Sequence, residues 1–295
     1  VYMEQNSIVD SKGFRRLEFS SSPEIYDNSL QAWFKDMTNY DLSLMHFLFG
    51  AGAEMANELG IKTEAAHWNK LKSQLPDFDL DNEGSLTFAK GFPYNASHRH
   101  FSHALAIHPL GIIDWSDGEK AQRIIRATLK KMNDYGPDYW TGYTYSWFAN
   151  MQARAFNGEE AAKALRTFAE CFCLKNTFHA NGDQSASGKS KFTYRPFTLE
   201  GNFAFAAGIH EMLLQSHTGV IRVFPAVPES WKNVSFNNLR AMGGFLVSAA
   251  LKDGKVVRLE IYAEKGGRLA VFSPFEHKVV EYDTQPGSRI DLAVE

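Results

Sequence analysis

The spacing of apolar and polar residues divides the chain into a helical part and a strand-rich part. Between Tyr40 and Leu59, apolar side chains recur three and four positions apart, which predicts a helix with one buried face. The same period predicts further helices over residues 63–75, 102–107, 116–133, 143–156, 159–174 and 202–216. After Gly219, apolar runs bounded by turn residues predict strands over 220–224, 245–251, 255–262, 268–272 and 278–282.

Turn and cap residues support this division. Gly60 follows the first helix at the position where a left-handed residue ends helices. Asp253-Gly254 separates two apolar runs and is the strongest hairpin signal in the chain. We therefore expect a mainly α fold with a helical region over 1–218 and a small antiparallel, β-sandwich-like domain over 219–295. The polar stretches 77–98 and 176–195 are predicted to be long loops, which often carry function.

Composition narrows the classes of function. The 295 residues include 31 basic and 34 acidic side chains, a net charge of −3, which implies no general attraction to nucleic acid or anionic membrane. No apolar run is long enough to span a bilayer. The only cysteines, Cys171 and Cys173, are too few for a structural zinc site and point to different sides of a helix, so we expect two buried thiols without a disulfide. Aromatic residues make up 14% of the chain, which fits either sugar binding or a large aromatic core. No cofactor is expected.

A first candidate site is the run His98-Arg99-His100-Phe101-Ser102-His103. Three imidazoles and a guanidinium supply several hydrogen-bonding groups of the kind that bind sugar hydroxyls. A metal site using His98, His100 and His103 is an alternative, but it needs further ligands, so no metal is predicted. Structural histidines are the other alternative.

Two carboxylates and one aromatic side chain extend the candidate set. Glu200 ends an apolar run before a predicted helix, so it is a catalytic group, a first-turn carboxylate that the helix N-terminus favours, or a partner for Arg195. Glu24 follows Pro23 in a loop, and glycoside hydrolysis commonly uses two carboxyl groups that flank the bond. Trp147 offers a stacking surface, although its helical spacing from Tyr143 also suits a core position.

Several segments together resemble glycoside hydrolase family 95, the α-L-fucosidases and their α-L-galactosidase relatives. The histidine-rich run is similar to that family's HRHxSH stretch, and Ser22-Pro23-Glu24 is similar to its SPE element. Residues 197–203, FTLEGNF, and 207–217, AGIHEMLLQSH, resemble its F-x-x-D-G-N-F block and the sequence that follows. Residues 225–228, PAVP, and 239–245, LRAMGGF, are similar to its β-domain signatures.

The resemblance implies a fold and a reaction. The fold would be part of an (α/α)6 toroid followed by a β domain, and the enzyme would be an inverting exo-glycosidase. Glu24 would be the general acid, and Glu200 would stand at an aspartate that works with asparagines to activate water. Arg99 and His100 match sugar-binding residues, and we add His98, Asn202 and Trp147 as expected substrate contacts. The substrate would be a plant or host oligosaccharide or polysaccharide. The resemblance also implies a polysaccharide-degrading bacterium and a periplasmic or secreted location.

Two departures from the family pattern set further expectations. Glu200 is one methylene longer than the family's aspartate, so its carboxylate is displaced by roughly an ångström. The helices account for only part of a toroid, and the upstream asparagines are absent. We therefore expect a C-terminal fragment of a larger enzyme whose N-terminal half completes the toroid. The alternative is a catalytically impaired remnant that still binds carbohydrate.

Overall fold

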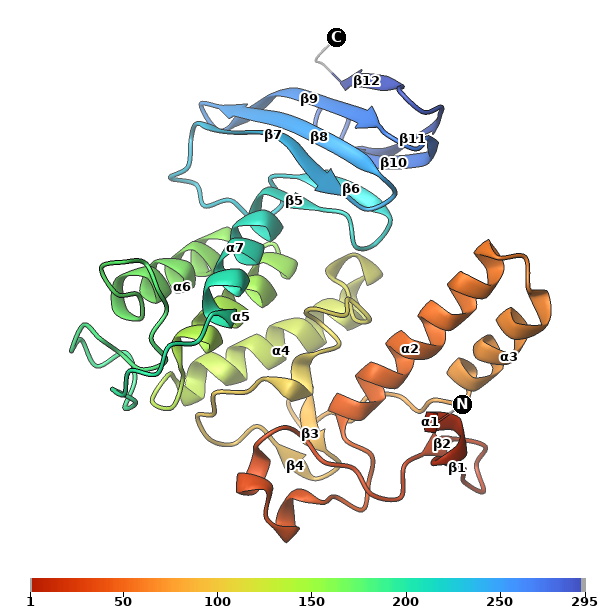
Figure 1. The fold of residues 1–295 in the computed structure, drawn as a ribbon, viewed down its shortest axis with the longest axis vertical. Helices are drawn as coiled ribbons and strands as arrows, with labels where there is room; N and C mark the ends of the chain where they lie inside the picture. Colours follow the sequence, from red (N-terminus) through yellow and green to blue (C-terminus); the bar gives the residue numbers. More distant parts are fainter. Residues whose placement is uncertain (1, 293–295) are drawn as a thin grey trace. The chain divides into compact units, whose positions relative to one another are not determined.

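The computed structural model describes residues 2–292 and divides into two compact units, residues 1–140 and 141–295. Figure 1 shows the elements along the chain, with helices through the first two thirds and sheets in the last third.

The first unit is built mainly from helices and short turns. Its α-helices and strands are α1 (Tyr2–Gln5), β1 (Ile8–Val9), β2 (Arg15–Arg16), α2 (Asn39–Glu58), α3 (Lys62–Ser73), β3 (Thr87–Ala89), β4 (Phe92–Pro93) and α4 (Glu119–Tyr135). Four 3-10 turns, Ile25–Asn28, Leu30–Ala32, Ser102–Ala104 and Trp115–Asp117, lie between them.

The predicted helical hairpin is confirmed as α2 and α3. The Thr38 side chain accepts a hydrogen bond from the Asp41 N–H and caps the start of α2. At the other end, Gly60 has φ of 72°, and the Gly60 and Ile61 N–H groups bond to the Asn57 and Ala56 carbonyls. This is a Schellman motif, so Gly60 ends the helix as its position predicts. The two helices bury Met37, Leu42, Met45, Phe49, Leu71 and Leu75.

Two of the expected helices differ from the structure. Residues 102–107 form only the short turn Ser102–Ala104, which is followed by isolated turns at the Ile107 and His108 N–H groups. The helix expected from 116 begins at Glu119, because Gly118 adopts a φ of 94° that no α-helix contains.

The second unit contains three long helices and most of the strands. Its helices are α5 (Gly142–Arg154), α6 (Gly158–Cys171) and α7 (Glu200–Leu213). Its strands are β5 (Leu214–Gln215), β6 (Val220–Val223), β7 (Val234–Ala241), β8 (Phe245–Lys252), β9 (Lys255–Ala263), β10 (Gly267–Ser273), β11 (Lys278–Thr284) and β12 (Arg289–Leu292).

The strands form two four-stranded sheets, in the orders β11-β10-β6-β5 and β12-β9-β8-β7. All pairs are antiparallel except β6 and β10, which are parallel. Both sheets contribute to one apolar core, which includes Ile221, Phe236, Val247, Ile261 and Val271. The second unit therefore confirms helices followed by a small, mainly antiparallel β region. The boundary at residue 218 and closure of the helices into a toroid remain predictions.

The hairpin between β8 and β9 has the predicted turn. Asp253 and Gly254 have φ values of 51° and 78°, and positive φ at both central residues defines a type I′ turn. Strand β7 was not predicted, because its register shifts between Phe236 and Leu239 and the apolar alternation is lost at this bulge.

Candidate active site

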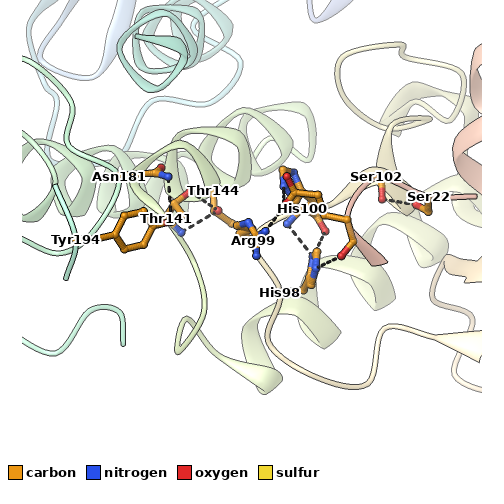
Figure 2. Close-up of polar contacts among 10 residues, drawn as sticks. Ser22, His98, Arg99, His100, Ser102, Thr141, Thr144, Asn181 and Tyr194 are labelled. Carbon is orange, nitrogen blue, oxygen red and sulfur yellow. Dashed lines mark hydrogen bonds and ion pairs between the residues drawn. The ribbon is translucent and has the colours of Figure 1, made fainter. Parts of the chain in front are cut away.

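The loop that carries Glu24 is fastened to the histidine-rich segment by a buried hydrogen bond. The Ser22 and Ser102 hydroxyls lie 2.6 Å apart and both residues are buried, as Figure 2 shows. Since 80 positions separate the two serines, this bond brings together two segments that the sequence does not join.

His98 connects the same two segments through its ring. Its Nδ1 accepts a hydrogen bond from the His100 N–H at 3.0 Å, and its Nε2 lies 3.3 Å from the Glu24 carbonyl oxygen. This arrangement requires the tautomer in which Nδ1 is free and Nε2 carries the proton. The Tyr94 hydroxyl also accepts the His98 N–H at 3.0 Å. His98 therefore positions Glu24 through the backbone.

The Glu24 carboxylate contacts two neighbours that can donate hydrogen bonds to it. Arg99 donates from its guanidinium, and His100 Nε2 lies 3.0 Å from the same carboxylate oxygen. Figure 2 shows Arg99 and His100 beside His98. Glu24 has φ of 56°, a left-handed conformation that is strained for a residue with a side chain. Strain of this kind persists where the surrounding contacts fix a functional side chain.

The cluster alters the pKa of both Glu24 and His100. Partial burial alone would raise the pKa of Glu24, but the charges and hydrogen bonds of His100 and Arg99 outweigh it and hold the pKa below its ordinary value. Burial lowers the pKa of His100, against the opposing effect of Glu24. In the free protein at neutral pH, Glu24 is therefore an ionised carboxylate and His100 is neutral.

His103 lies in the core, away from these contacts. It is fully buried and stacks on Tyr94 at 5.2 Å, with Phe88 at 4.7 Å. Neither ring nitrogen has a hydrogen-bond partner within residues 2–292. Burial lowers its pKa to about 3. Because His103 is surrounded by aromatic rings, the alternative of a metal site that includes it has no geometric support.

In the second unit, Glu200 is the first residue of α7 and is exposed. No ion pair to it occurs in the part of the chain that the structure describes, so the suggested pairing with Arg195 is not formed. Burial raises the pKa of Tyr143, and the Glu200 charge adds to this effect. Glu200 and Tyr143 are therefore electrostatic neighbours at the N-terminal ends of α7 and α5.

His179 holds these two helix ends in place. A Cβ at Gly142 would lie 2.3 Å from His179 Nε2, and one at Gly201 would lie 2.4 Å from His179 Nδ1. Only glycine can therefore occupy either position while this buried ring stays between them. His179 Nδ1 lies 2.7 Å from the Thr198 carbonyl oxygen, and the His179 backbone N–H donates to Asn202 Oδ1 at 3.0 Å.

The contacts and burial of Asn202 and Trp147 indicate how far each side chain is available to contact a sugar. The Asn202 amide also donates to the Thr177 carbonyl at 3.0 Å, so both ends of its amide group hold the loop before α7. Trp147 is 8% exposed on α5, with its ring 5.6 Å from Tyr143. The geometry favours a positioning role for Asn202 and a largely buried ring for Trp147, and their contact with substrate remains a prediction.

Comparison with known proteins identifies the family of the chain. A family profile described as "Glycosyl hydrolase family 95 catalytic domain" matches residues 2–213, and one described as "Glycoside hydrolase family 95, C-terminal domain" matches residues 215–291. The chain belongs to glycoside hydrolase family 95.

Two relatives of this family 95 chain carry names. A protein of Arabidopsis thaliana named "Alpha-L-fucosidase 2" is 31% identical over 232 residues, which cover 76% of this chain and 27% of that protein. A protein of Aspergillus niger named "Probable alpha-fucosidase A" is 23% identical over 247 residues, which cover 79% of this chain and 28% of that protein. The chain thus spans about a quarter of the length of these relatives.

Neither a metal site nor a membrane-spanning helix occurs among the described residues of this family 95 chain. Within residues 2–292, no group of three or more His, Cys, Asp or Glu side chains is arranged to hold a metal ion. No helix of that range is both long and apolar enough to cross a bilayer. Cys171 and Cys173 are free thiols, the first buried and the second half-buried, so the prediction of two buried thiols holds fully only for Cys171.

Sequence reasoning missed His179 and the serine pair. Ser22 and Ser102 lie inside the quoted motifs, but serine is common in surface loops and gives no local sign of burial. His179 lies in a stretch expected to be a loop. The two glycines that make room for it, Gly142 and Gly201, are the only signal that a bulky ring contacts both helix starts.

Replacing Arg99 with methionine is expected to raise the pKa of Glu24 relative to that in the wild type. The substitution removes the guanidinium that lowers the Glu24 pKa, whereas the burial that raises it and the contact with His100 both remain. Carbon-13 NMR titration of the Glu24 carboxyl measures the change. Arg99→Lys keeps the charge and serves as the control; an unchanged titration in Arg99→Met would show that the ion pair does not set the pKa.

Replacing His103 with phenylalanine is expected to flatten the pH dependence of stability. In the unfolded chain His103 has its ordinary pKa of 6.5, whereas burial in the folded protein lowers the pKa to about 3. Between these values the unfolded state binds more protons, so stability falls as the pH falls. From pH 6.5 to pH 5 the wild type should lose about 2 kcal/mol of unfolding free energy through this residue.

Urea unfolding of wild type and His103→Phe at both pH values measures this difference. The exposed His277 provides the matched control, and His277→Asn should keep the wild-type slope. Equal pH slopes for wild type and His103→Phe would contradict the buried, neutral imidazole.

Proposed function

We propose that this chain forms part of the active site of an inverting exo-glycosidase that acts on α-L-fucosides or α-L-galactosides. The observation that carries the proposal is the cluster in which Arg99 and His100 hold the Glu24 carboxylate. The names of the two relatives support the fucosidase class. The substrate would be an oligosaccharide or polysaccharide of plant or host origin, met in the periplasm or outside the cell.

Glu24 has to be protonated to act as general acid, yet its partners keep it ionised in the free protein. We infer that sugar hydroxyls take over the donors of Arg99 and His100 when substrate binds. The Glu24 carboxyl then loses the groups that stabilise its charge and is further desolvated, so its pKa rises. Substrate binding would thus prepare the proton for transfer to the leaving oxygen.

Glu200 would act on the other side of the bond. Its exposed carboxylate stands at the start of α7, where it can accept hydrogen bonds from a water molecule that attacks the sugar. His179 and Asn202 would keep the loop before α7 in position. In an inverting enzyme the two carboxyl groups lie about 6.5–9.5 Å apart when the site is assembled.

The chain matches only part of each named relative, so the proposed activity belongs to a larger enzyme. Because the chain spans about a quarter of their length, we propose the activity for the enzyme in which these residues fold. The family's water-activating asparagines would come from a segment outside this sequence, in an N-terminal half that completes the toroid.

A second candidate is a carbohydrate-binding remnant without catalysis. The low pKa of Glu24 favours it, since an ionised carboxylate cannot donate a proton. Titration calorimetry with an α-L-fucosyl disaccharide distinguishes the two candidates when it is combined with a hydrolysis assay. The remnant predicts saturable binding that survives Glu24→Gln and no turnover, either for this chain or for a longer protein that contains it. Turnover that Glu24→Gln abolishes supports the glycosidase.

A further inference from the structure

A groove of about 1270 Å³ lies on the second unit, at one end of the β region. Its walls come from the β6–β7 connection, the β8–β9 hairpin and the β10–β11 turn, together with Phe156 after α5. None of the residues placed in the candidate active site lines it.

The groove is preformed by backbone contacts. A Cβ at Gly158 would lie 2.5 Å from the Val227 carbonyl carbon, so the start of α6 packs directly on the groove wall. The Glu229 N–H donates to Glu159 Oε1 at 2.8 Å. The Gly254 N–H donates to the Lys232 carbonyl at 2.9 Å and links the hairpin to the β6–β7 connection. A preformed site loses less entropy on binding a ligand.

Aromatic rings make up much of the lining. Trp231 and three phenylalanines are half-buried, and Phe156 is 36% exposed. The phenylalanines are Phe224, Phe272 and Phe275. Flat apolar rings that remain partly accessible cover the C–H faces of pyranose sugars and can bind several in a row.

The charged side chains of the lining are predominantly basic. Arg222, Lys232 and Lys255 line the groove, against Glu229 as its one acidic lining residue, and His277 adds a titratable ring. Lys232 and Lys255 are exposed and form no ion pair within the described residues. Within residues 2–292, the Arg222 guanidinium donates only to the Thr218 hydroxyl, at 3.2 Å. The groove therefore presents uncompensated positive charge beside its aromatic rings.

We propose that this groove binds an acidic oligosaccharide, a chain of sugars that carries uronate carboxylates. The aromatic rings contact the pyranose faces, and the carboxylates pair with Lys232, Lys255 and Arg222. The site would hold the protein on an acidic polysaccharide. This inference does not depend on the proposed hydrolytic activity, because it concerns binding alone.

Calorimetric titration of the whole chain with a hexamer of galacturonic acid tests the proposal. The same hexamer with methyl-esterified carboxyls keeps the shape without the charge, and a hexamer of glutamic acid keeps the charge without the sugar rings. We expect saturable binding of the acidic hexamer that weakens several-fold between about 20 mM and about 300 mM NaCl. The esterified hexamer and the peptide should each bind at least about tenfold more weakly.

Variants assign the binding to the groove. Lys232→Ala/Lys255→Ala should weaken binding of the acidic hexamer by about tenfold at low salt, and both positions are exposed, so the fold should persist. Lys252→Ala removes an exposed lysine beside the hairpin that does not line the groove, and it should bind as the wild type does. No binding of the acidic hexamer, equal binding of the peptide or the ester, or unchanged affinity in the double variant would each overturn the proposal.

Discussion

Replacing Glu24 with glutamine is expected to lower kcat on a fucosyl disaccharide by about 10²–10⁴-fold. The amide has nearly the same shape, but it cannot donate the proton that the leaving sugar oxygen requires. Because Arg99 and His100 remain to bind hydroxyls, KM should change much less than kcat. The assay uses an enzyme that contains this chain, alongside the chain by itself.

The leaving group provides the control for this prediction. An aryl α-L-fucoside whose phenol is acidic departs without full protonation, so Glu24→Gln should slow its hydrolysis far less than that of the disaccharide. Equal losses on both substrates would mean that Glu24 does not act as the general acid. No loss of rate on either substrate would mean that Glu24 has no catalytic role.

Shortening Glu200 to aspartate is expected to lower kcat by about 10²-fold, because a shift of about 1 Å in a catalytic group can have that effect. The site would be built around the longer side chain, although the aspartate is the residue that the family carries there. Glu200→Gln keeps the length and removes the charge, and it should lose at least as much, since a neutral amide cannot polarise the water.

Glu119→Gln is the matched control, since Glu119 is an exposed first residue of α4, as Glu200 is of α7. It should leave kcat unchanged. If both Glu200 variants keep the wild-type rate, Glu200 is only a first-turn carboxylate of α7 and has no catalytic role. A faster Glu200→Asp enzyme would mean that the pocket keeps the spacing of the family aspartate.

Much of the fold follows from local patterns. Helices α2, α3 and α7 and the hairpin at Asp253-Gly254 were predictable, because their periodicity and turn residues agree with their tertiary surroundings. Strand β7 was not, because the bulge at Asn238, with φ of 54°, breaks the alternation that identifies strands. The 102–107 segment shows the reverse case, in which a short apolar pattern predicted a helix and only a 3-10 turn forms.

Only part of the candidate site could be predicted from the sequence. The motifs identify Glu24, Arg99 and His100, but a sequence cannot show that they contact one another, because the contact depends on the buried Ser22–Ser102 bond. The low pKa of Glu24 is likewise a product of this long-range contact. His103 shows the limit of motif reasoning, since it lies three positions from His100 and yet belongs to the core.

The most direct test of the account is the configuration of the first sugar released. Proton NMR of the enzyme that contains this chain, followed during early hydrolysis of an aryl α-L-fucoside, should show β-L-fucose before mutarotation, with the rate of release lowered by at least about 10²-fold in Glu24→Gln/Glu200→Gln. Initial release of α-L-fucose, or release at the wild-type rate in the double variant, would contradict the assignment of these carboxylates to an inverting glycosidase.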